Sequence, residues 1–95
     1  MMATVYVVIG DPDGRLSASG FAEYAEVVAR TIAEHAERLH GQWRSDPADA
    51  LPSACIAFRV AEAAVARLKQ ALATVRSHYG QRSIAWAEAA TTYFL

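Results

Sequence analysis

The sequence predicts an α+β fold of the ferredoxin-like, split βαβ type (βαββαβ), with two helices on one face of an antiparallel sheet. Two segments, residues 21–40 and 62–79, carry apolar side chains at helical spacing. A short apolar segment precedes each of them, and a glycine and a second strand-like segment follow. Two strand–helix–strand units in tandem make up this fold. Ninety-five residues correspond to one small domain, so we expect residues 1–95 to form a single domain.

The first predicted strand is the apolar run of residues 3–9, whose β-branched content is typical of a strand buried on both faces. Asp-Pro-Asp-Gly (residues 11–14) follows it. Proline at the second position and glycine at the fourth favour a type I turn. We expect residues 15–19 to be either a loop or the short second arm of a hairpin.

The first predicted helix covers residues 21–40. Its apolar residues are spaced at threes and fours, with Glu26 and Arg30 placed to pair on the exposed side and Gly41 as the expected stop. Residues 42–45 are expected to form a short strand in which Trp43 points inward. A loop with two prolines follows.

The second unit begins with a strand at residues 55–60, in which Ile56, Phe58 and Val60 share one face. The second helix, residues 62–79, carries a regular apolar stripe, and Gly80 is its predicted stop. In the last segment, residues 83–95, Ile84 and Trp86 alternate with alanines. Glu88 falls on their side, which predicts a bulge, a bend or an edge there.

Composition excludes several classes of partner. The net charge of −1 gives no field that would draw the chain to nucleic acid or an anionic membrane, and the longest apolar run is far shorter than a membrane span. We therefore expect no nucleic-acid or membrane partner. The single cysteine favours a cytoplasmic location. Much of the apolar content is alanine, so a homodimer would help to cover a thin core.

The candidate catalytic residue is Asp11, which follows the first strand together with Asp13. Strand-end carboxylates of this kind hold divalent metals in some small nucleases, but a metal needs further oxygen ligands and the sequence identifies none. His35 and His40 are five residues apart and so cannot form a zinc pair on one helix face. Glycine-rich nucleotide loops are absent. We expect a turn, with no metal and no cofactor.

The aromatic residues give the best indication of function. Trp43 follows the first helix, and Tyr93, Phe94 and Leu95 lie in the last segment, where exposed apolar side chains would be costly unless something covers them. We expect these four residues to bind a protein partner.

The sequence thus favours a small non-enzymatic protein-binding module. Such an adaptor, regulator or inhibitor, of the kind that phages and plasmids encode, would act through protein–protein contacts. Two alternatives stay open: a metal-dependent nuclease or phosphodiesterase centred on Asp11, and a small-molecule-binding sensor.

Overall fold

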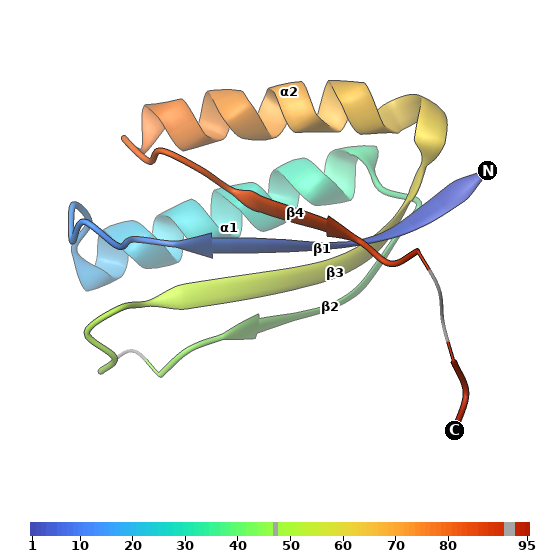
Figure 1. Cartoon of the computed structure of the whole chain (residues 1–95). Coiled ribbons are helices and arrows are strands. Elements are labelled where there is room, and N and C mark those ends of the chain that lie inside the picture. Colours follow the sequence, from blue (N-terminus) through green and yellow to red (C-terminus); the bar gives the residue numbers. More distant parts are fainter. Residues whose placement is uncertain (47, 91–92) are drawn as a thin grey trace.

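Two helices pack on one face of a four-stranded antiparallel sheet in this computed structural model, which describes residues 1–46, 48–90 and 93–95 (Figure 1). The elements are β1 (Met2–Gly10), α1 (Ala18–His35), β2 (Arg38–Arg44), β3 (Ser53–Ala61), α2 (Glu62–His78) and β4 (Ala85–Glu88). The strand order is β2-β3-β1-β4. The predicted ferredoxin-like fold is confirmed. No helix of the described residues has both the length and the apolarity needed to cross a bilayer.

The sheet alternates along its central strands. Val5, Val7 and Ile9 of β1 are buried beneath the helices, whereas Tyr6 and Val8 point to the other face and are exposed. The prediction that residues 3–9 are buried on both faces is therefore wrong. Its physical reason is that both helices cover the same face, so half of the side chains of β1 have no covering layer.

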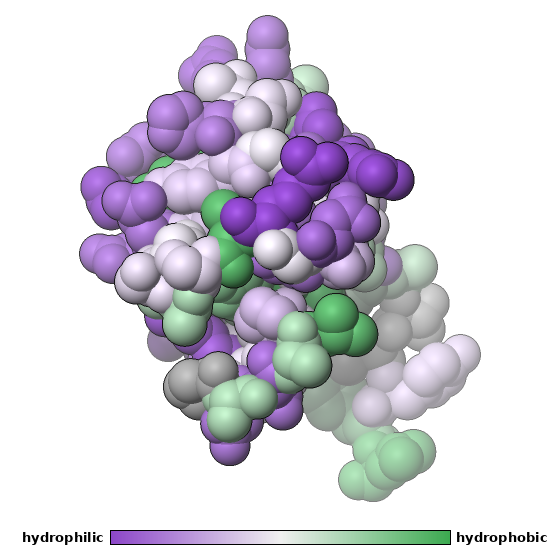
Figure 2. Space-filling model, turned by 90° about the vertical axis from the view of Figure 1, so that its left-hand side faces the viewer, coloured by the Kyte–Doolittle hydropathy of each residue, from purple (hydrophilic) through white to green (hydrophobic). Residues whose placement is uncertain are grey.

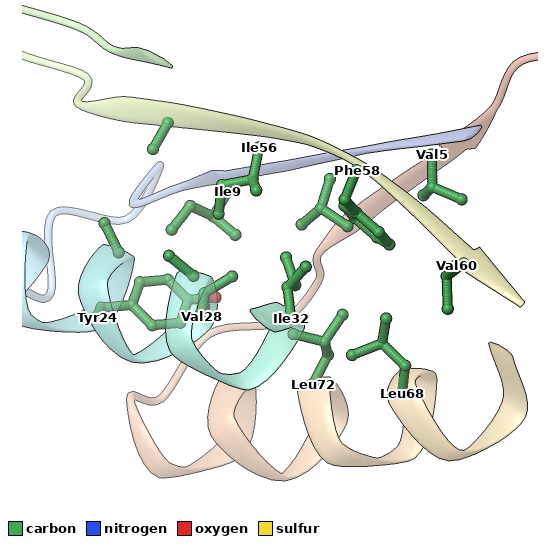
Figure 3. Close-up of a cluster of buried hydrophobic side chains, with 14 of the residues drawn as sticks. Val5, Ile9, Tyr24, Val28, Ile32, Ile56, Phe58, Val60, Leu68 and Leu72 are labelled. Atoms are coloured by element: carbon green, nitrogen blue, oxygen red, sulfur yellow. The ribbon is translucent and has the colours of Figure 1, made fainter. Parts of the chain in front are cut away.

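The core lies between the helices and the covered face of the sheet (Figure 3). The side chains of β1 and β3 meet Tyr24, Val28 and Ile32 of α1 and Leu68 and Leu72 of α2. The inward face of β3 consists of Ala54, Ile56, Phe58 and Val60, which confirms the predicted apolar face of that strand. Only two residues of α2 are fully buried, so α1 supplies most of the helical part of the core.

The predicted end of the second helix is correct, and the predicted end of the first helix is wrong. Gly80 follows α2 with a φ of +67°, as predicted for a glycine that stops a helix. α1 instead ends at His35, and Ala36 is extended, with a φ of −79° and a ψ of 149°. His40 and Gly41, expected at the end of the first helix, lie within β2. The N–H of Glu37 donates to the carbonyl of Arg59, so pairing with β3 replaces the last predicted turn of helix.

α1 begins one turn earlier than the apolar pattern indicates. Ser17 is its N-cap, and its hydroxyl accepts a hydrogen bond from the N–H of Gly20 at 3.0 Å. Residues 15–17 form a loop, not the arm of a hairpin. The predicted pair of Glu26 and Arg30 is present on the exposed side of α1, with 3.8 Å between its charged atoms.

Tyr24 provides a test of the core. Its side chain is fully buried and packs against Tyr79 with 5.0 Å between ring centroids, but within the described residues its hydroxyl has no hydrogen-bond partner. Burial raises the pKa of Tyr24 to about 12, although the charge of Arg76 opposes this shift. Because an unpaired buried hydroxyl costs about 1–3 kcal/mol, we expect Tyr24→Phe to keep or increase the free energy of unfolding in urea. A clear loss of stability would show that the hydroxyl is bonded.

Candidate functional site

The segment after β1 forms the predicted turn. The N–H of Gly14 donates to the carbonyl of Asp11 at 3.1 Å, and Gly14 has a φ of +63°, a conformation that favours glycine. Asp13 lies on the outside of this turn, where its carboxylate is 3.4 Å from Arg82 and 3.8 Å from Arg15. Exposed ion pairs of this kind contribute little, so Asp13 does not determine the position of the turn.

Asp11 has a different environment, because its side chain is buried. One carboxylate oxygen accepts hydrogen bonds from the N–H of Arg15 and the side-chain amide of Gln81, both at 3.0 Å, and the other accepts the N–H of Leu16 at 2.8 Å. Burial raises the pKa of Asp11, but these three hydrogen bonds outweigh it, so the pKa lies below the ordinary 3.8. The carboxylate thus joins the turn to the loop that follows α2.

These hydrogen bonds limit what Asp11 can do chemically. Three of the roughly four lone-pair sites of its carboxylate already accept hydrogen bonds from the protein, which leaves one acceptor site, on the oxygen that is bonded to Leu16. Among residues 1–46, 48–90 and 93–95, no three acidic, histidine or cysteine side chains gather where they could hold a metal ion. The arrangement suits a structural carboxylate better than a metal ligand or a general base.

A pocket of about 220 Å³ lies beside Asp11, between the start of α1 and the connection from β2 to β3. Figure 2 shows this end of the molecule, where hydrophobic surface (green) lies in hollows between hydrophilic residues (purple). The pocket wall includes Phe21 and Leu16 together with Ser17, Arg44 and Ser53. Ser17 already caps α1, so its hydroxyl serves the helix. The pocket has the volume to hold a small molecule, and its wall also includes Asp11, Asp46 and Asp49, although among the described residues no three such side chains gather as a metal site would need.

The most extensive candidate surface is the outer face of the sheet, on the side away from the helices. The strand register places two rows of side chains across all four strands on this face. The first row is Trp43, Cys55, Val8 and Ala85, and the second is Gly41, Ala57, Tyr6 and Ala87. None of these eight residues is charged. Arg38 and Arg59 are cross-strand neighbours at the border of these rows. We call these eight residues the outer-face patch.

Trp43 belongs to the outer-face patch and is 60% exposed, so the prediction that it points inward is wrong. The cause is a β-bulge. Leu39 pairs with Phe58 on the core side. Gly41 pairs with Ala57, which is adjacent to Phe58 in the antiparallel partner strand, so His40 is an extra residue in β2. This insertion reverses the alternation and moves Trp43 to the outer face, opposite Cys55.

The other predicted partner-binding residues are also exposed. Tyr93 and Phe94 are 82% and 95% exposed, and Leu95 is exposed next to them. The chain end lies away from the body and far from both helices (Figure 1). β4 ends at Glu88 and is an edge strand of the sheet, and an edge is one of the three features predicted at this residue.

Sequence reasoning missed Tyr6, Val8 and Cys55 as candidate contact residues. Tyr6 and Val8 are exposed and Cys55 is half-buried. Their place on the uncovered face follows from the one-sided placement of the helices, a signal that was available once the fold was predicted. The position of Trp43 could not be found in that way, because a bulge at His40 leaves no mark in the hydrophobic pattern.

Comparisons with known proteins show no family for this chain. No protein-family model and no curated protein sequence matches the chain. The chain is similar to a solved structure described as a "putative amidohydrolase/peptidase" from Burkholderia cenocepacia, with 14% identity and a TM-score of 0.49 over 93% of this chain and 27% of that one. It is also similar to a protein of unknown function from Nitrosomonas europaea, with 12% identity and a TM-score of 0.44 over 99% of this chain and 93% of that one. Neither similarity bears on what this chain does.

Proposed function

We propose that this chain is a small non-enzymatic protein-binding module that forms a homodimer through the outer face of its sheet. The observation that supports this function most directly is the outer-face patch. Eight uncharged residues in two cross-strand rows lie on a face that no helix covers. Burial of this apolar surface against a partner would be favourable.

A second copy is the occupant that the composition of this face favours. An uncharged centre with arginines at its border resembles the apolar core and polar rim of a protein interface. Two such sheets can pack face to face about 10 Å apart, each contributing the same patch around a twofold axis. A partner with a charged surface would have to leave its charges unpaired against Val8 and Ala57.

The size of the outer-face patch indicates that it does not act alone. With strands about 4.8 Å apart and two rows along them, the patch covers roughly 250 Å². A stable interface buries about 800 Å² on each partner. The exposed Tyr93 and Phe94 can each add about 150–250 Å², which brings the total close to that of a stable dimer. We therefore assign Tyr93, Phe94 and Leu95 to the same interface.

Val8→Glu tests this function. Val8 lies near the middle of the outer-face patch and is exposed, so the variant should fold but should not bury its new charge in a dimer. We expect sedimentation velocity to give a dimer for the intact chain and a monomer for Val8→Glu. Ala63→Glu is the matched control, because it adds the same charge at an exposed position of α2 and should stay dimeric.

Removal of residues 93–95 tests the contribution of the chain end. We expect the shortened chain to stay folded and to dimerise more weakly than the intact chain. A monomeric intact chain, or a Val8→Glu variant that remains dimeric, would overturn the assignment of the outer-face patch to a second copy. Circular dichroism spectra of each variant establish that a smaller species is folded.

A further inference from the structure

A second surface lies at the opposite edge of the sheet from β2, between α2 and β4. It is a hollow of about 200 Å³ lined by Lys69, Leu72, Ala73, Arg76, Ile84 and Trp86. The four residues of α2 in this set fall on one side of the helix, and Ile84 and Trp86 come from the inward side of the last strand segment. We call this hollow the α2–β4 groove. Its floor is apolar and its helical wall is basic.

One side of the α2–β4 groove is the free edge of β4. In the strand order β2-β3-β1-β4, β4 pairs only with β1. The N–H of Ala89 donates to the carbonyl of Thr4, so by alternation Ala87 and Ala85 also exchange hydrogen bonds with β1. The backbone groups of Trp86 and Glu88 then point away from the sheet. An edge of this kind can accept another strand.

The charges around the α2–β4 groove are nearly all positive. Lys69 places its Nζ 5.0 Å from the centre of the Trp86 ring, and Arg76 donates from Nη1 to the carbonyls of Gln81 and Arg82. In the described part of the chain, neither cation forms an ion pair with a carboxylate. Residues 63–87 contain no acidic residue. Glu88 is the acidic residue nearest to this strand edge, and its carboxylate accepts the indole N–H of Trp86 at 3.0 Å.

We propose that the α2–β4 groove binds an extended, acidic segment of a partner protein, which adds to the sheet as a fifth strand beside β4. The backbone of the segment would pair with the free N–H and C=O groups of Trp86 and Glu88. An apolar side chain of the segment would occupy the hollow over Leu72 and Ile84, and its carboxylates would meet Lys69 and Arg76. Charge complementarity therefore selects an acidic segment over a basic one.

This site is separate from the outer-face patch, because Lys69, Arg76 and Leu72 belong to the helical layer on the other side of the sheet. The proposal therefore goes beyond homodimer formation. A chain that is monomeric could still bind such a segment, and a chain that binds none could still dimerise.

The test uses the intact chain and an eight-residue peptide, labelled with fluorescein, whose odd positions alternate glutamate and valine and whose even positions are threonine. Because side chains two residues apart share one face of a strand, its glutamates and valines can face the α2–β4 groove together. Binding is followed by fluorescence anisotropy. We expect saturable binding that weakens as salt is raised, and no comparable binding of the matching lysine–valine peptide. Lys69→Glu is expected to weaken binding by about tenfold or more. Arg67→Glu is the matched control, since it makes the same charge change on α2 outside the α2–β4 groove, and its affinity should stay within about twofold.

A second peptide tests whether the backbone is recognised. Methylation of alternate amides on the edge that faces β4 removes the donors that strand addition needs, so binding should be lost while the charge is unchanged. Equal binding of the methylated and unmethylated peptides would overturn the proposal. So would unchanged affinity in Lys69→Glu, or an oligothymidylate that binds more tightly than the acidic peptide.

Discussion

Replacement of Leu72 by alanine is expected to lower the free energy of unfolding by about 2–5 kcal/mol. The Leu72 side chain is 3% exposed and extends from α2 toward Ile32 and Leu68 in the core (Figure 3). Alanine would leave a cavity that the surrounding side chains can fill only in part. Small domains have total stabilities of about 5–15 kcal/mol, so this single change would remove a large share of the stability.

Leu51→Ala is the matched control for this prediction. Leu51 is 67% exposed in the connection between β2 and β3, so the same chemical change should alter stability by less than about 0.5 kcal/mol. Urea unfolding followed by circular dichroism measures both variants, at one fixed protein concentration because association would add to stability. A shift in melting temperature below about 3 °C for Leu72→Ala would contradict the packing of α2 described above.

The fold could be predicted because local patterns and tertiary structure agree over most of the chain. The stripe on residues 62–79 becomes the buried side of α2, where Leu68 and Leu72 are its two fully buried members. Ile56, Phe58 and Val60 alternate as expected of a strand with one covered face. In these segments the local sequence favours one type of secondary structure, and that same structure also buries the most apolar area.

The end of α1 could not be predicted because its sequence suits two structures. Leu39 continues the helical spacing, and it equally fits a strand in which it packs opposite Phe58. Gly41 would stop a helix, but it lies instead in β2 beside the bulge at His40. Pairing with β3 decides between the two, because it bonds the backbone of residues 38–44 as an edge strand of the sheet.

The turn after β1 could be predicted, but the role of its first carboxylate could not. Proline and glycine at fixed positions indicate the turn without knowledge of the rest of the chain. The hydrogen bond between Asp11 and Gln81 joins residues 70 positions apart, and no local pattern predicts such a pair. The same limit explains why the sequence did not separate the structural Asp11 from the exposed Asp13.

Asp11→Asn is expected to destabilise the protein by about 1–3 kcal/mol at pH 7, because an amide has the shape of the carboxylate but only one acceptor oxygen. If that oxygen keeps its bonds to Arg15 and Gln81, the amide NH₂ group faces the N–H of Leu16. Two hydrogen-bond donors then face each other, and neither has an acceptor there. Asp13→Asn is the matched control, since it changes the same charge on the exposed side of the turn and should cost less than about 0.5 kcal/mol.

The difference in free energy of unfolding between wild type and Asp11→Asn should also depend on pH. The pKa of Asp11 in the folded protein lies below its ordinary value of 3.8, so the unfolded chain binds the proton more readily than the folded chain. The contribution of Asp11 is therefore fully present above the ordinary pKa and decreases as the pH falls through the lowered one. Urea unfolding of both proteins at pH 7 and at about pH 3 should show a smaller difference in free energy of unfolding at the lower pH. A variant as stable as wild type at both values would mean that the carboxylate is not needed by the fold, which would leave Asp11 free for the metal-dependent chemistry that its hydrogen bonds now oppose.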